Sequence, residues 1–598
     1  MVRRLNASAI CLTLALLADL LAPAPARPAP YPVNACVSLK QKEAGRYCRA
    51  VLQAWSAWER SQDSVGRDHS LENAARQLGG RWAQAEADAL RQGTNCAETT
   101  LESGAAQSRI DAAVGDVVAA INAGLDLGRV ADARCGGRLL SAAGSKCSQI
   151  LVAEGVHVKD LQRDADGTVL EAALAAASAE FARAWTDEID AGCPTSAAQA
   201  EVEGLIDAAA ADLVHDTVVS PHVDDTQFTT YGPVAPTSYL GRTFTPICMK
   251  GTPYYFFAKR GTLNKLIIYY QGGGACWDSL TCSLPSCDAT VDPTGSDDPN
   301  NRNAGFADLA NPANPFRDWN IVFVPYCSCD VHFGDAAQNY PPHVEHRGYE
   351  NARVVEKWAR EHFVDPDEVF VTGSSAGAYG AWFNAPLHER VWPASQFEVL
   401  ADAGNGVITQ SFLDNYFPNW NFAANIPTDI PGLTDVLTNG TGIVGYTEVV
   451  TSFFPATRWA NYSAAYDGGV GGQSSFYNIM LNNNNPIAAL TWWDAVCPFN
   501  AVMRSQAHAI AAAAPSNYRY YIGTGSRHTM WGSNKVYTDT TGGVPTLVDW
   551  VGAMLAGTPA WTNVECTNCG LLLPGDPAPN PLQPPFSMIG TDIVITCP

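Results

Sequence analysis

The sequence predicts an α/β protein in two parts. A catalytic domain with a mostly parallel sheet is preceded by an all-α, disulfide-bonded helical domain. In the second part, β-branched and aromatic runs alternate with helical stretches, which is typical of parallel strands joined by right-handed crossovers. In residues 35–219, apolar residues recur every three or four positions, as amphipathic helices require. The cysteines of that region also recur at fixed spacing, which indicates a repeat.

The first 26 residues are expected to be a secretory signal peptide. Arg3 and Arg4 precede a mostly apolar run at 9–21, and small residues with prolines follow up to Ala26. The alternative is an N-terminal membrane anchor, although no later run reaches the roughly 18 apolar residues of a membrane span. Cleavage would remove Cys11 and leave sixteen of the seventeen cysteines, an even number that suits an oxidising compartment. We therefore expect a secreted protein, extracellular or periplasmic.

Charge and composition exclude several classes of partner. The 598 residues include 37 basic and 60 acidic ones, so the formal charge is −23. Nucleic acids and anionic membrane surfaces are polyanions and would be repelled. With 46% hydrophobic and 16% charged residues, the chain has a globular composition. The sequence contains no phosphate-binding or nucleic-acid motif, and it does not indicate an oligomeric state.

The helical domain, 35–219, is predicted to be a tandem duplication of units 35–133 and 134–219. Its six cysteines fall into two sets of three at offsets of 99, 99 and 97 residues: Cys36, Cys48 and Cys96, then Cys135, Cys147 and Cys193. Antiparallel helix hairpins favour Cys48–Cys96 and Cys147–Cys193, which leaves Cys36–Cys135, although six cysteines allow fifteen pairings. Two roles remain open for this domain: a binding or spacer module, and a structural appendage or pro-region.

A Pro/Thr-rich linker is predicted at 220–239, and the catalytic domain at 240–598. Strands are expected at 265–270, 319–325, 368–372, 397–401, 458–466 and 518–522, with helices at 349–363 and 376–392. The Pro-rich tail, 566–598, contains three cysteines and is expected to be tied by disulfides. Its Cys566-x-x-Cys569 pattern also fits zinc, but the even cysteine count favours disulfides.

The chemistry of the chain is indicated first by Gly373-Ser374-Ser375-Ala376-Gly377, a G-x-S-x-G motif. A predicted strand precedes it and a helix rich in small residues follows it. In the α/β-hydrolase fold, such a motif forms a strained turn that exposes the serine hydroxyl above the sheet. Ser375 is therefore the candidate nucleophile.

A serine hydroxyl needs a base, and in this architecture the acid and then the base follow the nucleophile in the chain. His528 is the best-placed base, because it lies in a glycine-rich loop after the strand 518–522. His332, His343 and His346 precede Ser375, and His508 lies in an alanine-rich helix.

The acid should lie between Ser375 and His528. Asp467 ends a strand and opens a glycine-rich turn, so it is the first candidate. Asp402, one strand earlier, and Asp494, in an apolar run, remain alternatives. The acid would hold the tautomer of the imidazole and stabilise the imidazolium.

A glycine-rich loop, 271–277, directly follows the first predicted strand. Acyl transfer develops a negative oxygen, which preorganised backbone N–H groups stabilise. The expected donors of this oxyanion hole are Gly274 and Ala275 in the loop and Ala376 after the nucleophile. The chemistry requires no cofactor and no metal.

Together these segments resemble the pectin acetylesterase and Notum family of carboxylesterases, over roughly residues 241–550. The matching stretches are YYQGGGACW, PYCSCDVHFGD, GSSAGAYG, LADAGNG and AAYDGG. Ala275 stands where the family's loop has tryptophan, Trp277 is displaced past Cys276, and the acid turn is stretched before Gln473. The helical region has no counterpart in the family. The resemblance implies a secreted, disulfide-rich serine hydrolase that removes acyl groups without a metal.

The expected function is that of a secreted serine carboxylester hydrolase. It would deacylate an O-acetylated polysaccharide such as pectin through an acyl-enzyme. One alternative is an esterase or depolymerase for longer acyl chains or a polyester. The alternative from another class is a catalytically silent binding protein on the same fold.

Overall fold

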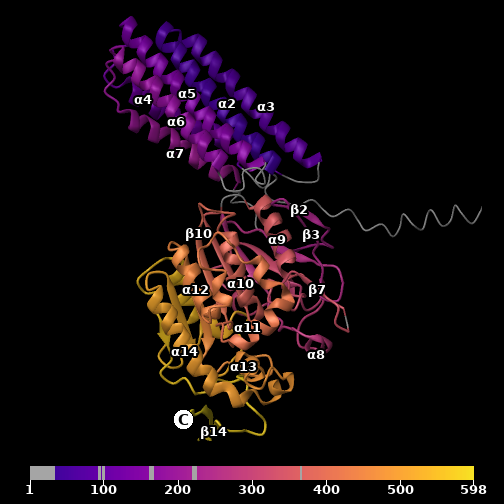
Figure 1. The fold of residues 1–598 in the computed structure, drawn as a ribbon. Coiled ribbons are helices and arrows are strands. Elements are labelled where there is room, and N and C mark those ends of the chain that lie inside the picture. Colours follow the sequence, from indigo (N-terminus) through magenta and orange to yellow (C-terminus); the bar gives the residue numbers. More distant parts are fainter. Residues whose placement is uncertain are drawn as a thin grey trace, which may run out of the picture.

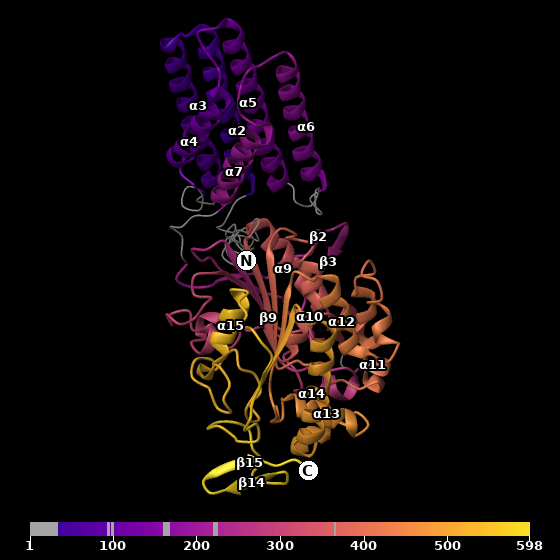
Figure 2. The same cartoon turned by 90° about the vertical axis from the view of Figure 1, so that its left-hand side faces the viewer.

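The computed structural model describes residues 34–91, 96, 101–159, 168–218, 225–341, 343–363 and 366–598. The expected signal peptide lies outside these residues. A helical bundle occupies one end of the molecule, and the sheet domain lies below it (Figures 1 and 2). The hairpin of β14 (Phe586–Ile589) and β15 (Asp592–Ile595) lies at the opposite end.

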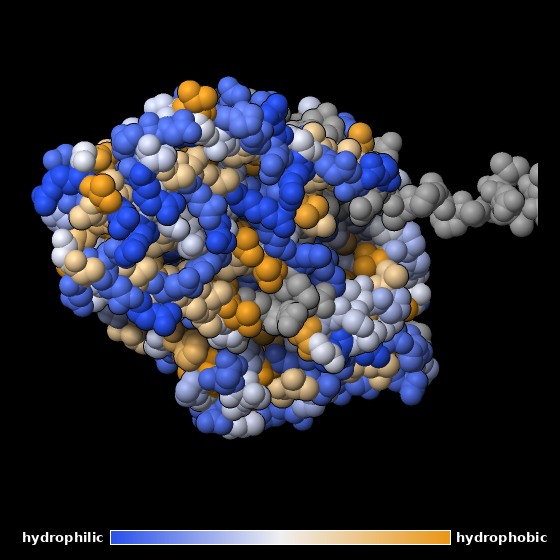
Figure 3. All heavy atoms as spheres, turned by 90° about the horizontal axis from the view of Figure 1, so that it is seen from above, coloured by the Kyte–Doolittle hydropathy of each residue, from blue (hydrophilic) through white to orange (hydrophobic). Residues whose placement is uncertain are grey.

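The bundle has six helices within the described residues: α2 (Asn34–Ser61), α3 (Ser64–Arg91), α4 (Ser103–Asn122), α5 (Val130–Lys159), α6 (Thr168–Asp190) and α7 (Gln199–Val218). Its buried side chains form a hydrophobic cluster distinct from that of the sheet domain. The face of the molecule seen from above is mainly hydrophilic, with smaller apolar areas between the hydrophilic ones (Figure 3). No helix among the described residues is both long and apolar enough to cross a bilayer.

The predicted cysteine pairing of the bundle is wrong. The bridges are Cys36–Cys96, Cys48–Cys147 and Cys135–Cys193. Cys36 lies at the start of α2. In the α2–α3 hairpin this position is beside the end of α3, and Cys96 follows that end. Cys48 is twelve residues further along, about 18 Å at 1.5 Å per residue, and so lies in the middle of α2. There it meets its repeat counterpart, Cys147, on α5.

Helices α2 and α5 pack antiparallel and very closely. A Cβ atom at Gly155 would lie 2.8 Å from the Ser38 carbonyl oxygen, and one at Gly137 would lie 2.9 Å from that of Ser56. Glycine is therefore required where the two backbones meet. This contact explains why the bridge between the repeats joins the middle cysteines of the two units.

Within the described residues all sixteen cysteines are paired, in eight disulfides. Besides the three in the bundle these are Cys248–Cys327, Cys276–Cys282, Cys287–Cys329, Cys497–Cys597 and Cys566–Cys569. Cys597 ties the tail to α14 (Val496–Ala513), as expected. Cys566 and Cys569 bind each other, so the zinc alternative is not supported.

The central sheet confirms the predicted fold class. Its order is β1-β4-β6-β5-β9-β10-β11-β12-β13, and all pairs from β6 to β13 are parallel. The strands are β1 (Thr229–Tyr231), β4 (Phe256–Lys259), β5 (Lys265–Tyr270), β6 (Asn320–Val324), β9 (Glu368–Ser374), β10 (Gln396–Asp402), β11 (Arg458–Ala464), β12 (Tyr518–Gly523) and β13 (Val564–Glu565). The antiparallel pairs β1–β4 and β4–β6 at one edge were not predicted.

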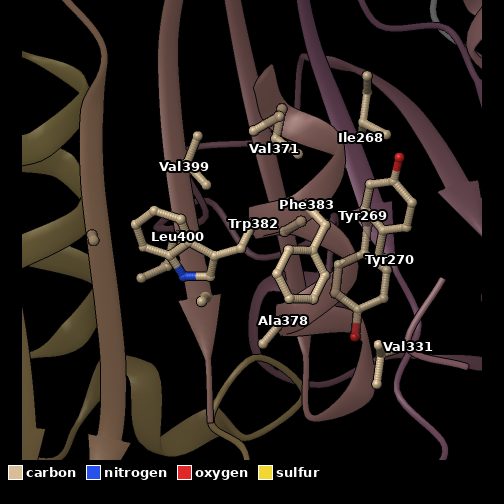
Figure 4. Close-up of a cluster of buried hydrophobic side chains, with 14 of the residues drawn as sticks. Ile268, Tyr269, Tyr270, Val331, Val371, Ala378, Trp382, Phe383, Val399 and Leu400 are labelled. Carbon is tan, nitrogen blue, oxygen red and sulfur yellow. The ribbon is translucent and has the colours of Figure 1, made fainter. Parts of the chain in front are cut away.

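Helices cover both faces of the sheet (Figure 2). The helices of this domain are α8 (Ser279–Ser283), α9 (Gly348–His362), α10 (Ala376–His388), α11 (Gln410–Tyr416), α12 (Gly442–Phe453), α13 (Gln473–Leu481), α14 and α15 (Leu547–Leu555). Two small hairpins, β2 (Thr237–Tyr239) with β3 (Arg242–Phe244) and β7 (Ala336–Gln338) with β8 (Val344–His346), lie outside the sheet. Trp382 and Phe383 of α10 pack under Val371 and Val399 of the sheet (Figure 4), which fixes the helix that follows Ser375.

The separate cores lead to a prediction about truncation. A chain that begins at Asp225 is expected to fold and to keep the turnover of a small soluble ester, because interdomain contacts within a chain are often modest. The start point matters, since the Asp225 carboxylate accepts hydrogen bonds from Arg260 Nε and Nη2 at 2.9 and 2.7 Å. Turnover of a p-nitrophenyl ester and circular dichroism test this. A folded but inactive truncation would mean that the bundle completes the active site.

Candidate active site

Ser375 lies on a strained turn between β9 and α10. Its φ of 58° and ψ of −122° are unfavourable for a residue with a side chain, and such conformations cost about 1–3 kcal/mol. A Cβ at Gly373 would lie 2.2 Å from the Gly377 carbonyl oxygen, and one at Gly377 would lie 2.0 Å from that of Tyr270. Both glycines are thus required by close backbone approach, and the turn exposes the Ser375 hydroxyl at the end of β9.

The structure brings Ser375, His528 and Asp467 into one hydrogen-bonded chain. His528 Nε2 lies 2.9 Å from Ser375 Oγ, and His528 Nδ1 lies 2.8 Å from Asp467 Oδ1. Asp467 follows β11 and His528 follows β12, and the carboxyl ends of these parallel strands meet at the same edge of the sheet. With Nδ1–H donated to Asp467, Nε2 is free to accept the Ser375 proton.

The electrostatics of His528 favour its protonated form. Burial opposes the charge, but the Asp467 carboxylate, through its charge and its hydrogen bond, and the nearby Asp402 together raise the pKa of His528 above its ordinary value. This is the arrangement that stabilises an imidazolium.

Gln473, the first residue of α13, supports the acid. Its backbone N–H donates to Asp467 Oδ1 at 2.9 Å, and its side-chain Nε2 donates to Oδ2 at 3.1 Å. Gln473 Oε1 accepts from the Asn405 N–H at 2.8 Å. Asp467 itself is fully buried. The role of Gln473 was not predicted, because no local sequence pattern marks a glutamine that reaches back across a turn.

The hydrogen bonds of Asp402 go to groups other than the His528 imidazole. Its carboxylate accepts hydrogen bonds from the Met530 and Trp531 N–H groups at 2.9 Å each, and from Ser374 Oγ at 2.8 Å. Its carbonyl oxygen accepts from the Ser375 N–H at 2.8 Å. This buried residue therefore joins the turn of the nucleophile to the loop that carries the base.

The other candidates lie elsewhere. Asp494 is exposed, and His508 binds Glu565 on the surface. His343 is exposed, and His346 is buried among the disulfide loops. His332 is fully buried, which lowers its pKa to about 4 and keeps it neutral. Its Nε2–H donates to the Gln271 carbonyl oxygen at 2.8 Å, so it holds the start of the glycine-rich loop.

The glycine-rich loop passes directly over the nucleophile. A Cβ at Gly272 would lie 2.4 Å from the Ser374 carbonyl oxygen and 3.0 Å from Ser375 Cβ. Gly274 is exposed beside the nucleophile, with φ +77°, while Ala275 is partly buried and Ala376 begins α10. The Cys276 N–H donates to the Cys329 carbonyl oxygen at 3.0 Å, and Trp420 Nε1 donates to that of Cys276 at 2.9 Å. These bonds fix the far side of the loop.

A cavity of about 790 Å³ opens at Ser375 and His528. It descends along the face of β5 and β6, and its apolar walls include Ile267, Tyr269, Phe306, Ile321, Phe323 and Trp531. Side chains of one sheet face recur every second residue, so Tyr269 and Ile267 form successive levels. Ile267 precedes Gln271 by four residues, which places it about 13 Å below the glycine-rich loop at 3.3 Å per residue.

Comparison with known proteins adds the family. The sequence model of the pectinacetylesterase family matches residues 242–428, which include the glycine-rich loop and Ser375 but neither Asp467 nor His528. This part of the chain is similar to the pectin acetylesterase and Notum family of carboxylesterases.

The relatives are distant. The chain is 28% identical to palmitoleoyl-protein carboxylesterase notum2 of Xenopus laevis over 26% of its own length and 34% of the relative's. It is 26% identical to pectin acetylesterase 11 of Arabidopsis thaliana over 29% of its length and 46% of the relative's. The matches thus span about a third to a half of these curated relatives. Among solved structures, the Wnt deacylase Notum from Drosophila aligns with 54% of this chain and 92% of its own, at 14% identity and a TM-score of 0.39.

Proposed function

We propose that the protein hydrolyses carboxylic esters through an acyl-enzyme. The observation that carries the proposal is the hydrogen-bonded chain from Ser375 Oγ through His528 to Asp467. Ser375 Oγ attacks the ester carbonyl carbon while His528 Nε2 takes its proton. His528 then gives this proton to the departing alcohol. A water molecule, activated by the same nitrogen, attacks the acyl-enzyme and releases the acid.

The negative oxygen of each tetrahedral intermediate needs N–H donors. We assign this role to the backbone of Gly274, Ala275 and Ala376, which lie on the two segments that border Ser375. Such donors contribute about 3 kcal/mol each to the stabilisation of the transition state. Asp467 holds the imidazole in the tautomer that leaves Nε2 free to accept.

We also propose that the protein is exported. Eight disulfides account for every cysteine after Cys11, and structural disulfides persist in oxidising compartments. A signal peptide at 1–26 would supply the route.

Two substrate classes are proposed. The first is an O-acetylated polysaccharide, in keeping with the pectinacetylesterase match. The second is an ester of a longer apolar acid, and the cavity favours it. Pockets of about 300–1,000 Å³ enclose whole drug-sized ligands, and the 790 Å³ here are walled largely by apolar side chains. An acetyl group would leave most of that apolar wall in contact with water, whereas a longer chain would cover it.

The experiment that tests the proposal is a panel of esters with the purified mature protein. Acetylated pectin, acetylated xylan, aliphatic polyesters and p-nitrophenyl esters from acetate to dodecanoate are compared by kcat/KM. A maximum beyond acetate supports the apolar class, and a preference for acetylated polymers supports the first class. Turnover no higher than that of Ser375→Ala on every ester would contradict hydrolase function and leave a binding protein.

The raised pKa of His528 predicts a pH dependence. The base must be neutral, so kcat/KM is expected to fall as pH decreases through a pKa above the ordinary value of about 6.5. Asp467→Asn removes the charge that raises this pKa. The acid limb of the pH profile, which is the fall of kcat/KM at low pH, should therefore move to lower pH. At the same time, kcat should fall by about 10⁴. Asp494→Asn is the matched control, because Asp494 is exposed and lies outside the hydrogen-bonded chain of Ser375, His528 and Asp467. An unmoved limb in Asp467→Asn would contradict the pairing.

A further inference from the structure

The far wall of the cavity contains a residue from outside the hydrolase sheet core. Phe228 lines the cavity and lies ten residues after Val218, the last residue of α7. We propose that Phe228 is a specificity-determining residue, because the segment 225–228, which directly precedes β1, closes the distal end of the substrate cavity. The inference rests on the proposed ester hydrolysis. It identifies the residue that limits the length of the acyl chain that the cavity can bind.

The register of the sheet places Phe228 at the bottom of the cavity. Phe228 precedes Thr229, which pairs with Ala258 of β4, and Ala258 pairs with Val322 of β6. Phe228 therefore lies on the level of Ile321, which pairs in turn with Ile267 of β5. This is the deepest level of the lining, about 13 Å below the glycine-rich loop. A short acyl group at Ser375 would not reach it.

The segment is held firmly on the side of the sheet. Asp225 binds Arg260 through two hydrogen bonds with the guanidinium and one with the backbone N–H. Three residues after Phe228, the Tyr231 ring stacks on Phe256 at 5.1 Å and packs against Trp358 at 4.6 Å. The backbone on both sides of Phe228 is thus anchored to the sheet domain.

A second set of bonds joins Phe228 to the opposite wall. The Phe228 N–H donates to Asn300 Oδ1 at 2.7 Å, and Asn300 Nδ2 donates to the Phe228 carbonyl oxygen at 3.0 Å. Asn300 belongs to the turn Pro299–Asn301, and Pro299 and Arg302 on either side also line the cavity. The reciprocal pair fixes the aromatic ring between the sheet face and this loop, where it acts as a floor.

The test uses the full chain and substitutions of different size. Phe228→Ala opens the floor, so the ratio of kcat/KM for p-nitrophenyl dodecanoate to that for p-nitrophenyl butyrate should rise at least fivefold. Phe228→Trp fills the same space and should lower the ratio at least fivefold. Asn300→Ala frees the Phe228 backbone and should shift the ratio in the same direction as Phe228→Ala. Phe453→Ala, at an exposed phenylalanine of α12, is the matched control.

A binding measurement keeps the inference separate from catalysis. In a Ser375→Ala background, calorimetry with dodecanoate should show at least a fivefold weaker affinity for Phe228→Trp than for unsubstituted Phe228. Circular dichroism confirms folding of each variant. If the wild type is active but both Phe228 variants keep its chain-length ratio and its dodecanoate affinity, the role of Phe228 is overturned and ester hydrolysis is not. If the wild type is inactive but Phe228→Trp still binds dodecanoate less tightly, ester hydrolysis is overturned and the role of Phe228 at the end of the cavity is supported.

Discussion

Ser375→Ala is expected to lower kcat for a p-nitrophenyl ester by about five to six orders of magnitude. The substitution removes the oxygen that attacks the carbonyl carbon and leaves only the contribution of the N–H donors and of binding, about 10³–10⁴ over water. His528→Ala should cost nearly as much, since the triad acts as a unit.

The measurement is kcat on the soluble ester together with covalent labelling by a fluorophosphonate, which reacts with an activated serine. Wild type should be labelled and Ser375→Ala should not. Ser374→Ala is the neighbouring control: it loses one hydrogen bond to Asp402 and should show a modest loss with labelling intact. Wild-type turnover in Ser375→Ala would place the nucleophile elsewhere.

Much of the catalytic domain could be predicted because its signals are local. The run KLIIYY became β5 with the same bounds, since a buried parallel strand is a continuous apolar stretch that ends at glycines. The turn at Ser375 was recognisable because glycine is obligatory at 373 and 377, where backbone oxygens lie about 2 Å from a would-be Cβ. Asp467 and His528 were selected because the acid precedes the base in the chain. Both lie within hydrogen-bond distance of their partners, and their catalytic roles are proposed.

The unpredicted features depend on contacts between distant segments. Strand β1 has three residues, too few for a periodic signal, and it forms because Asp225 and Tyr231 anchor it. The cysteine pairing of the bundle followed from the α2–α5 crossing, which cysteine spacing does not encode. A signal was present: Gly137, Gly144 and Gly155 lie within one long helix, where glycine is unfavourable unless another backbone comes close.

Asp402 carries the second large expected effect. It was an alternative for the acid, yet its carboxylate binds the Met530 and Trp531 N–H groups, two and three residues after the base. Asp402→Asn replaces one acceptor oxygen by an N–H donor that faces other donors. The loop must shift, and a displacement of about 1 Å at reacting groups costs about 10²-fold in rate. We expect kcat to fall about 10²-fold, with a smaller change in KM.

A purely structural role would not move the pH profile, whereas a positioning role for Asp402 should. The negative charge of Asp402 helps to raise the pKa of His528, so the acid limb of Asp402→Asn should move to lower pH, in the same direction as Asp467→Asn. Unfolding free energy should also fall, by about 1–3 kcal/mol for each buried donor left unpaired. Ser374→Ala removes one of the donors and keeps the charge, so its limb should stay where the wild type has it. If Asp402→Asn lost stability but kept kcat and the pH of the acid limb, the carboxylate would support the fold only. The alignment of His528 with Ser375 would then have to depend on Asp467 and Gln473 alone.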